Sequence, residues 1–372
     1  MNELRLLPQD VVCWGHGILP SALASLNNRG VQSPILFSIP ELADIIEARI
    51  RPALPVSSGR YLDFPPHVPD IAVEAALDAV RQCQAKSIIA LGGGSVLDAA
   101  KAVSHMHFLR FGSYLPIAAL PTTLSGSEFS HFFGITETNR EDKFKRSYAV
   151  RETTPKMVIL DPMLIVGTPR SLLLSSAIKG LDHAIEGMRK IDPDHPHAII
   201  AARGVSRFLA ILRRWPKDAT TAEALASGSV SMEDLLQLQL SAWHCYFYPA
   251  SVVYGLSHRI GHILGGTFGL PHSMTSCITL APVIGACAEY YGDKLDGFTQ
   301  LSNNHSTAES LSEAIASVVR HLGLPSRIGD FGLESCALPK VVAMLQEHYR
   351  EEVGDLGDQA ESKLFRLLEN MW

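Results

Sequence analysis

The chain has few of the features that mark secreted, membrane-spanning or nucleic-acid-binding proteins. Its six cysteines are scattered without a CxxC pair, which argues against a disulfide framework or a structural zinc ribbon. No apolar run approaches the roughly 20 residues of a membrane helix, and the N-terminus has no apolar stretch of signal-peptide length. The net charge is −6, without a block of lysine and arginine for a nucleic acid. We therefore expect a cytoplasmic protein in a reducing setting, with no membrane or nucleic-acid partner.

The sequence is rich in apolar residues instead. Of its 372 residues, 47% are hydrophobic and only 19% are charged, so a large packed core is readily supplied. This balance excludes intrinsic disorder, and the length is typical of a two-domain enzyme.

The first 160 residues alternate short apolar runs with helical patterns. We predict buried strands at residues 34–38, 87–91, 115–120 and 157–160, where the runs are short and rich in branched side chains. Residues 68–85 carry the apolar face of a crossover helix. This alternation indicates a mostly parallel sheet with helices on its faces.

The pattern becomes helical from Pro169 onward, with a clear break at residues 192–196. We predict an N-terminal α/β domain over residues 1–162 and a C-terminal helical domain over residues 163–372. A cleft between two such domains is the expected place for a ligand.

A glycine-rich turn follows the second predicted strand, in the segment IIALGGGSVLDAAK at residues 88–101. Glycines let a backbone turn tightly and bring its amides close to an anion at the start of a helix. The segment predicts a phosphate cradle, although it is neither the G-x-G-x-x-G fingerprint nor a Walker motif. A strand–glycine–helix turn of this kind also occurs as a plain structural connector.

A second polar loop follows the third predicted strand and reads LPTTLSGSE at residues 120–128. Its hydroxyls suit a polar ligand, and its alternative interpretation is an ordinary surface turn. Because both loops follow strand ends, where open α/β sheets bind cofactors, together they favour a nucleotide site.

Histidines gather in the helical half of the chain. His258 and His262 stand four residues apart and share a helix face, and His272 follows after a Gly-Gly break. Lys179 and His183 form a second pair with the same spacing. Imidazole clusters bind zinc or iron, or exchange protons near neutral pH, whereas a lone buried histidine is usually only hydrogen-bonded.

Five segments, in order, resemble the iron-containing alcohol dehydrogenase family: GGGSVLDAAK, LPTTLSGSE, LDP, HAIEG and GLSHRIGHILGGTFGLPH. The resemblance covers roughly residues 10–290, and LPTTLSGSE and HILGGTFGLPH are most similar to its maleylacetate reductase branch. It implies the dehydroquinate synthase-like fold, an α/β dinucleotide-binding domain with a parallel sheet followed by a helical domain. It also implies a homodimer and hydride transfer between NAD or NADP and a small-molecule substrate.

The resemblance assigns roles to individual residues. Three histidines match metal ligands of the family, and His262 matches the histidine beside the nicotinamide that is given a proton-transfer role. The ligand matches are His183, His258 and His272. The cofactor-binding matches are Gly92, Gly93, Gly94, Ser95, Asp98, Thr122, Thr123 and, across a variable hairpin, Lys145.

One position departs from the family. The remaining metal ligand of the family is an aspartate four residues before His183, and here that residue is Lys179. An ammonium removes an oxygen donor and changes the local charge by two units, so we predict no catalytic iron or zinc. Lys179 would instead polarise a carbonyl, with His258 or His262 relaying the proton. In the alternative, Lys179 reaches solvent or pairs with Asp182 or Glu186.

We therefore predict a metal-independent NAD(P)H-dependent reductase of a small oxo-acid, enone or aldehyde. Its catalytic residues would be Lys179, His183, His258, His262 and His272. One alternative is a member repurposed for cyclisation, dehydration or isomerisation, and another is a binding protein without chemistry. NAD and NADP both stay open, because Ser38 neither repels nor clamps a 2′-phosphate. Aromatic and histidine side chains at residues 243–248 suit either a pocket wall or an ordinary core.

Overall fold

The computed structural model describes residues 4–55, 58–65, 68–138, 144–299 and 308–372, apart from the side chains of Phe144, Lys145, His272 and Thr299. The chain forms two compact units. The first comprises Met1–Thr168, Met232–Gln239 and Tyr248–Ala250, and the second comprises Pro169–Ser231, Leu240–Phe247 and Ser251–Trp372. The predicted domain boundary after residue 162 stays a prediction.

A parallel sheet of six strands, in the order β1-β8-β5-β4-β2-β3, forms the centre of the first unit. The four central strands are the four that the sequence predicts, because they carry the continuous apolar runs of strands covered on both faces. The edge strands β1 and β3 were not predicted. The bounds are β1 (Val11–Trp14), β2 (Pro34–Phe37), β3 (Arg60–Tyr61), β4 (Ser87–Gly92), β5 (Ile117–Pro121) and β8 (Met157–Leu160).

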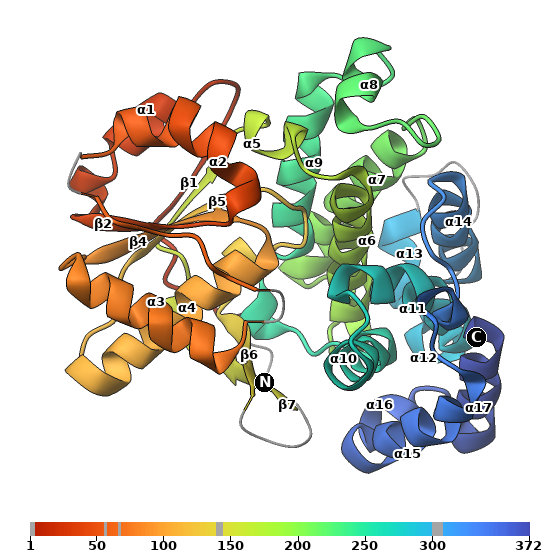
Figure 1. Ribbon diagram of the computed structural model, residues 1–372. Coiled ribbons are helices and arrows are strands. Elements are labelled where there is room, and N and C mark those ends of the chain that lie inside the picture. Colours follow the sequence, from red (N-terminus) through yellow and green to blue (C-terminus); the bar gives the residue numbers. More distant parts are fainter. Residues whose placement is uncertain (1–3, 56–57, 66–67, 139–143, 300–307) are drawn as a thin grey trace. The chain divides into compact units, whose positions relative to one another are not determined.

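Helices cover both faces of this sheet (Figure 1). On one face lie α1 (Leu19–Ala24) and α2 (Ala43–Ile45), and on the other lie α3 (Asp70–Gln82) and α4 (Gly94–Phe111). A separate antiparallel pair, β6 (Phe132–Glu137) and β7 (Phe144–Ala149), was not predicted. The predicted α/β class of this half is confirmed.

The second unit is helical in its described part, as predicted. Its central helix is α6 (Arg170–Glu186), which is buried without interruption from Leu173 to Glu186 and packs against α7, α10 and α11. The other helices of the C-terminal half are α5 (Met163–Val166), α7 (Pro196–Leu212), α8 (Thr221–Ala226), α9 (Met232–Cys245), α10 (Leu256–Phe268), α11 (His272–Ala286), α12 (Ala288–Tyr291), α13 (Asp296–Thr299), α14 (Ala308–His321), α15 (Leu338–His348), α16 (Arg350–Gly354) and α17 (Ala360–Met371).

Two further observations concern the described residues as a whole. None of their helices combines the length and apolar character needed to cross a membrane. All six cysteines lie among them as free thiols, of which Cys83 and Cys336 are exposed.

Candidate active site

The glycine turn and the second polar loop lie side by side at the carboxyl ends of β4 and β5. Strand β4 ends at Gly92, Gly93 precedes the first helical residue, and α4 begins at Gly94. The backbone N–H of Thr122 donates to the Gly92 carbonyl oxygen at 3.0 Å. A backbone hydrogen bond therefore links the glycine turn to the second polar loop, the two segments predicted to bind a nucleotide.

The turn needs its glycines because other atoms approach its backbone closely. A Cβ on Gly93 would lie 2.9 Å from Cγ2 of Thr123, and one on Gly92 would lie 2.7 Å from Cγ2 of Val96. Gly93 has no side chain to cap α4, and its carbonyl oxygen accepts from the amides of Val96 and Leu97, so the first two amides of this 18-residue helix, at Gly94 and Ser95, face the turn. Such an uncapped, positive helix end fits the pyrophosphate of a dinucleotide.

The remaining predicted cofactor residues have different surroundings. Thr122 and Thr123, which belong to the second loop, are buried. The carboxylate of Asp98 is bound by Ser127 and Lys101 and not only by solvent. Lys145 lies on β7 opposite Thr136, but its side chain is outside the described part.

In the second unit, Lys179 lies in the middle of α6 and is 2% exposed. Its Nζ donates to Oδ2 of Asp182 at 2.8 Å and lies 3.0 Å from Nδ1 of His258 on α10. The alternative in which Lys179 reaches solvent is therefore wrong. Its pairing with Asp182, the other alternative, is what the structure contains.

The ion pair is completed by a third helix. Ser276 on α11 donates its hydroxyl to the same oxygen of Asp182 at 2.7 Å. Burial would raise the pKa of Asp182, but the Lys179 charge and the His258 hydrogen bond outweigh it and hold the pKa well below its usual range. Burial and the Lys179 charge lower the pKa of His258, so its imidazole is neutral. The site therefore contains one buried ammonium, one carboxylate and one neutral ring.

Aromatic rings pack around this ion pair. Tyr246 stacks on His183 with ring centroids 4.1 Å apart, and Tyr254 stacks on His258 at 4.7 Å. His262 meets His258 edge-on at 4.7 Å. His262 is only half-buried, whereas His183 and His258 are buried, so it is the ring of this group nearest to solvent. His272 is the first residue of α11, and its side chain lies outside the described part.

The carboxyl group of Glu186 binds the first turn of α10. One carboxylate oxygen accepts the backbone N–H of His258 at 3.2 Å, and the other accepts the hydroxyl of Tyr291 at 3.0 Å. Burial and the charge of Asp182 raise the pKa of Glu186 to about 8. Its oxygen takes the place of the missing side-chain cap at the start of α10. Sequence reasoning named Glu186 only as a possible partner of Lys179.

The described residues of this site do not form a binding site for a divalent metal ion. Among the described side chains, no group of three or more His, Cys, Asp or Glu is arranged to hold one. The ammonium of Lys179 lies against both Asp182 and His258, so a dication in reach of either donor would meet a positive charge at short range.

Comparison with known proteins identifies the family. Residues 9–162 match the model described as iron-containing alcohol dehydrogenase, and residues 244–353 match the C-terminal model of the same family. A maleylacetate reductase of Pseudomonas sp. (strain P51) is 30% identical over 270 residues, which cover 72% of this chain and 71% of that one. The chain belongs to the iron-containing alcohol dehydrogenase family. As a member, it is an NAD(P)-dependent oxidoreductase, which favours redox chemistry over the two alternatives.

Solved structures of the family have the same fold. An iron-containing alcohol dehydrogenase from Corynebacterium glutamicum superposes with a TM-score of 0.85 at 25% identity, over 100% of this chain and 96% of that one. A maleylacetate reductase from Agrobacterium tumefaciens superposes with a TM-score of 0.82 at 20% identity, over 100% of this chain and 98% of that one. The predicted family, fold class and cofactor class are thereby confirmed.

Proposed function

We propose that the protein is a metal-independent NAD(P)H-dependent reductase of a small oxo-acid, enone or aldehyde, in which the ammonium of Lys179 does the work of the family's metal. The observation that carries this proposal is the burial of Lys179 between Asp182 and His258. A buried, paired cation at this position supplies positive charge where a carbonyl oxygen becomes negative.

Lys179 has a donor to spare for that oxygen. An ammonium has three N–H donors, and within the described residues two of them are used by Asp182 and His258. The third donates a charge-assisted hydrogen bond to the substrate oxygen, which strengthens as negative charge develops there. Bound NADH or NADPH would supply the hydride, held at the glycine turn by Gly92–Ser95 and by Thr122 and Thr123.

The same residues move the proton. Lys179 donates a proton from Nζ to the reduced oxygen, and a proton from solvent then restores the ammonium, while Nδ1 of His258 holds Nζ in place as a hydrogen-bond acceptor. His262, the neighbouring half-buried ring, connects this pair with solvent. Asp182 accepts a hydrogen bond from Nζ of Lys179, and its carboxylate is also held by Ser276.

The substrate class is inferred from the charge of the site and from the relatives. A carboxylate-bearing substrate suits a site lined by a lysine and histidines, and relatives at 30% and 28% identity are named maleylacetate reductases. Ser38, the residue after β2, donates its hydroxyl to the Leu91 carbonyl oxygen at 2.8 Å, and a serine there neither repels nor clamps a 2′-phosphate. NADH and NADPH are therefore both candidate hydride donors.

The experiment combines metal analysis with a substrate screen. Purified protein, with and without chelator treatment, is analysed for iron and zinc and assayed with NADH and NADPH against oxo-acids, enones and aldehydes. We expect unchanged reduction after chelation and a loss of at least 100-fold in kcat/KM in Lys179→Met. Lys217→Met, which removes an exposed lysine of the same unit, should match the wild type. Stoichiometric iron or zinc whose removal abolishes turnover would refute metal independence.

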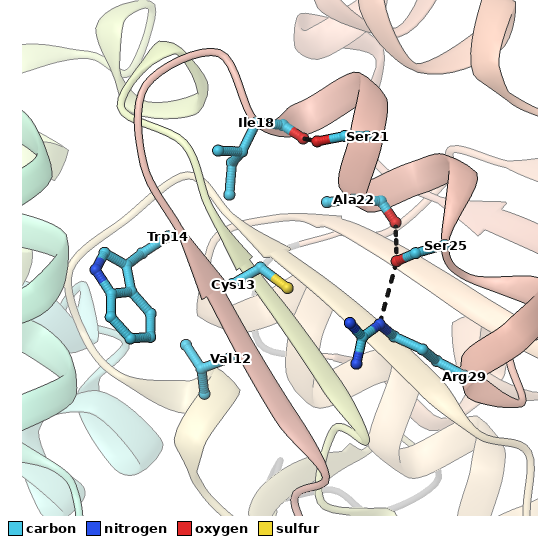
Figure 2. Close-up of a pocket in the computed structure, with 8 residues that line it drawn as sticks. All are labelled: Val12, Cys13, Trp14, Ile18, Ser21, Ala22, Ser25 and Arg29. Atoms are coloured by element: carbon cyan, nitrogen blue, oxygen red, sulfur yellow. Dashed lines mark hydrogen bonds between the residues drawn. The ribbon is translucent and has the colours of Figure 1, made fainter.

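The homodimer and the cytoplasmic location are proposals as well. Edge strand β1 exposes half of Trp14 and borders a surface groove of about 370 Å³, in which Arg29 donates to Ser25 at 3.2 Å (Figure 2). No predicted site residue lines this groove, so it is available to a second copy. Light scattering on the purified protein tests the dimer, and a single-chain mass in dilute solution would contradict it. The six free thiols support a reducing compartment.

A further inference from the structure

A fully buried lysine lies beneath the second polar loop of the nucleotide site. Lys101, on α4, is 0% exposed. Its Nζ donates to the carbonyl and hydroxyl oxygens of Ser127, both at 2.9 Å, and to the carbonyl oxygen of Phe132 at 2.7 Å. The ammonium thus donates three hydrogen bonds to the segment that follows β5. Burying a charge is costly, so this arrangement calls for a reason beyond packing.

The counter-ion of Lys101 is Asp98, one turn earlier on α4. Oδ1 of Asp98 lies 3.2 Å from Nζ of Lys101 and accepts the hydroxyl of Ser127 at 2.6 Å. Burial lowers the pKa of Lys101, and the charge and hydrogen bond of Asp98 act against that shift. Ser127 therefore sits between two charges on one helix, and both charges face the loop.

The loop in turn touches the glycine turn. A Cβ on Gly94 would lie 3.5 Å from Oγ of Ser125, and Thr123 packs against Gly93. Gly126 has a φ of +85°, so the chain reverses between these contacts and Ser127. The position of Ser127 on α4 therefore sets how closely Thr123 packs against Gly93 of the glycine turn.

We propose that Lys101 and Asp98 are positioning residues of the nucleotide site: they fix the second loop on α4 and do not contact the cofactor. Lys101 follows Gly94 by seven residues, about 10 Å along the helix, which places it well behind the amides that would meet the pyrophosphate. The proposal changes the role of Asp98, which the family resemblance assigned to cofactor contact. It rests on cofactor use and is independent of the metal-free chemistry proposed for Lys179.

If Lys101 only positions the loop, its loss should affect NADH and NADPH equally. If it contacts the cofactor, its loss can affect the two differently. A loop that is displaced weakens every dinucleotide alike, because NADH and NADPH share the pyrophosphate and the nicotinamide half. We expect Lys101→Met to raise the Kd of both by about the same factor, tenfold or more. Ser127→Ala removes the shared hydroxyl without leaving a new buried side-chain charge, and it should raise both Kd values about threefold.

The test is a fluorescence titration of each variant with NADH and NADPH well below its melting temperature, together with amide hydrogen exchange. Lys86→Met removes an exposed lysine of the same unit and should bind as the wild type does. In Lys101→Met the amides of residues 122–130 should exchange faster, while those of α3 should not. A purely structural lysine would lower the melting temperature and leave the Kd of folded protein unchanged, which would overturn the proposal.

Two further results would also overturn it. A rise in Kd confined to NADPH would indicate direct contact with the 2′-phosphate. If Lys101→Met does not fold, Ser127→Ala decides, and an unchanged Kd in that variant would contradict anchoring through Ser127. The proposal also predicts that Lys101→Met raises the Kd by a smaller factor in the Ser127→Ala background than in the wild type. The hydrogen bond between Lys101 and the Ser127 hydroxyl is already missing in that background.

Discussion

At the scale of single residues, the charge at position 179 decides which ions the helical unit can hold. A carboxylate there would add an anionic oxygen to His183 and His258, whereas Lys179 adds a cation that already binds Asp182 and His258. Lys179 and Asp182 neutralise each other inside the protein, and the ammonium offers hydrogen-bond donors in place of an anionic oxygen.

Replacing the lysine by the family's residue should restore metal binding. In Lys179→Asp, the new carboxylate joins His183, His258 and His272, which is the donor set that the resemblance implies. We expect this variant to bind about one Zn²⁺ per chain by isothermal titration, and the wild type to bind none at these residues. Lys179→Met serves as the control for the loss of positive charge alone. Equal zinc binding by wild type and Lys179→Asp would contradict the prediction.

The buried ion pair also predicts a stability coupling. Asp182→Asn leaves the ammonium of Lys179 without its counter-ion in a buried site, which should lower the free energy of unfolding by about 3–5 kcal/mol. The double variant Asp182→Asn/Lys179→Met should recover much of that loss, since it removes the unpaired charge. Urea denaturation of the two single variants and the double variant measures the coupling, and strictly additive losses would argue against it.

The residues of the site differ in how far sequence could reveal them. The histidine pair at 258 and 262 and the pair at 179 and 183 follow from the four-residue period of a helix. Ser276 could not be found this way, because its bond to Asp182 spans 94 residues and depends on how α11 packs on α6. Lys101 was read as part of a helix after a glycine turn, and only the structure places its ammonium under the loop.

At the scale of elements, helix α10 depends on a neighbour for its first turn. Gly255 precedes it and has no side chain to cap it, and Glu186 of α6 provides the acceptor. A Cβ on Gly255 would lie 2.9 Å from Oε2 of Glu186. Because Tyr291 and His258 hold that carboxylate, it has little freedom to move aside.

We therefore expect Gly255→Ala to destabilise the protein by about 1–3 kcal/mol, through the clash with the Glu186 carboxylate. It should also lower reductase activity, because α10 carries His258 and His262. Gly354→Ala is the matched control in the same unit, since nothing lies within 4 Å of the Cβ that it would add. Thermal unfolding and the reductase assay test both effects. Equal melting temperatures for the two variants would contradict this account of the helix start.

The strands predicted from the sequence are the fully buried ones, and the strands that were missed are less buried. The runs at β2, β4, β5 and β8 are fully buried, and their sequence is unambiguous. Strand β1 reads VVCW, an apolar run of four residues that is only partly buried and ends in the exposed Trp14, and the sequence analysis did not predict it. The hairpin of β6 and β7 mixes charged and aromatic side chains, so neither strand carries the continuous apolar run of the central strands.

At the scale of the whole molecule, buried carboxyl groups link stability to pH. Glu128 is 1% exposed, and burial raises its pKa to about 7, although Lys101 acts in the opposite direction. A folded-state pKa above the unfolded value means that the stability present at low pH is lost as pH rises toward 7. The size of this loss is on the order of 3 kcal/mol.

Glu128→Gln should remove that dependence. We expect its melting temperature to equal the wild-type value near pH 5 and to exceed it at pH 8, where the wild-type carboxylate is charged and buried. Glu41→Gln, at an exposed position of the same unit, should differ from wild type at neither pH. Calorimetry at the two pH values measures the difference. A variant that is less stable at pH 8 would show that the ionised carboxylate stabilises the fold.

The two exposed thiols have a practical consequence. Cys83 follows α3 in the first unit and Cys336 precedes α15 in the second, whereas Cys245, Cys277 and Cys287 are buried. With the half-buried Cys13 replaced by serine, maleimide reagents would attach one probe to each unit of the otherwise native chain. A pair of fluorophores or spin labels at these positions would report the distance between the two labels, and a titration with NADH would measure whether that distance changes.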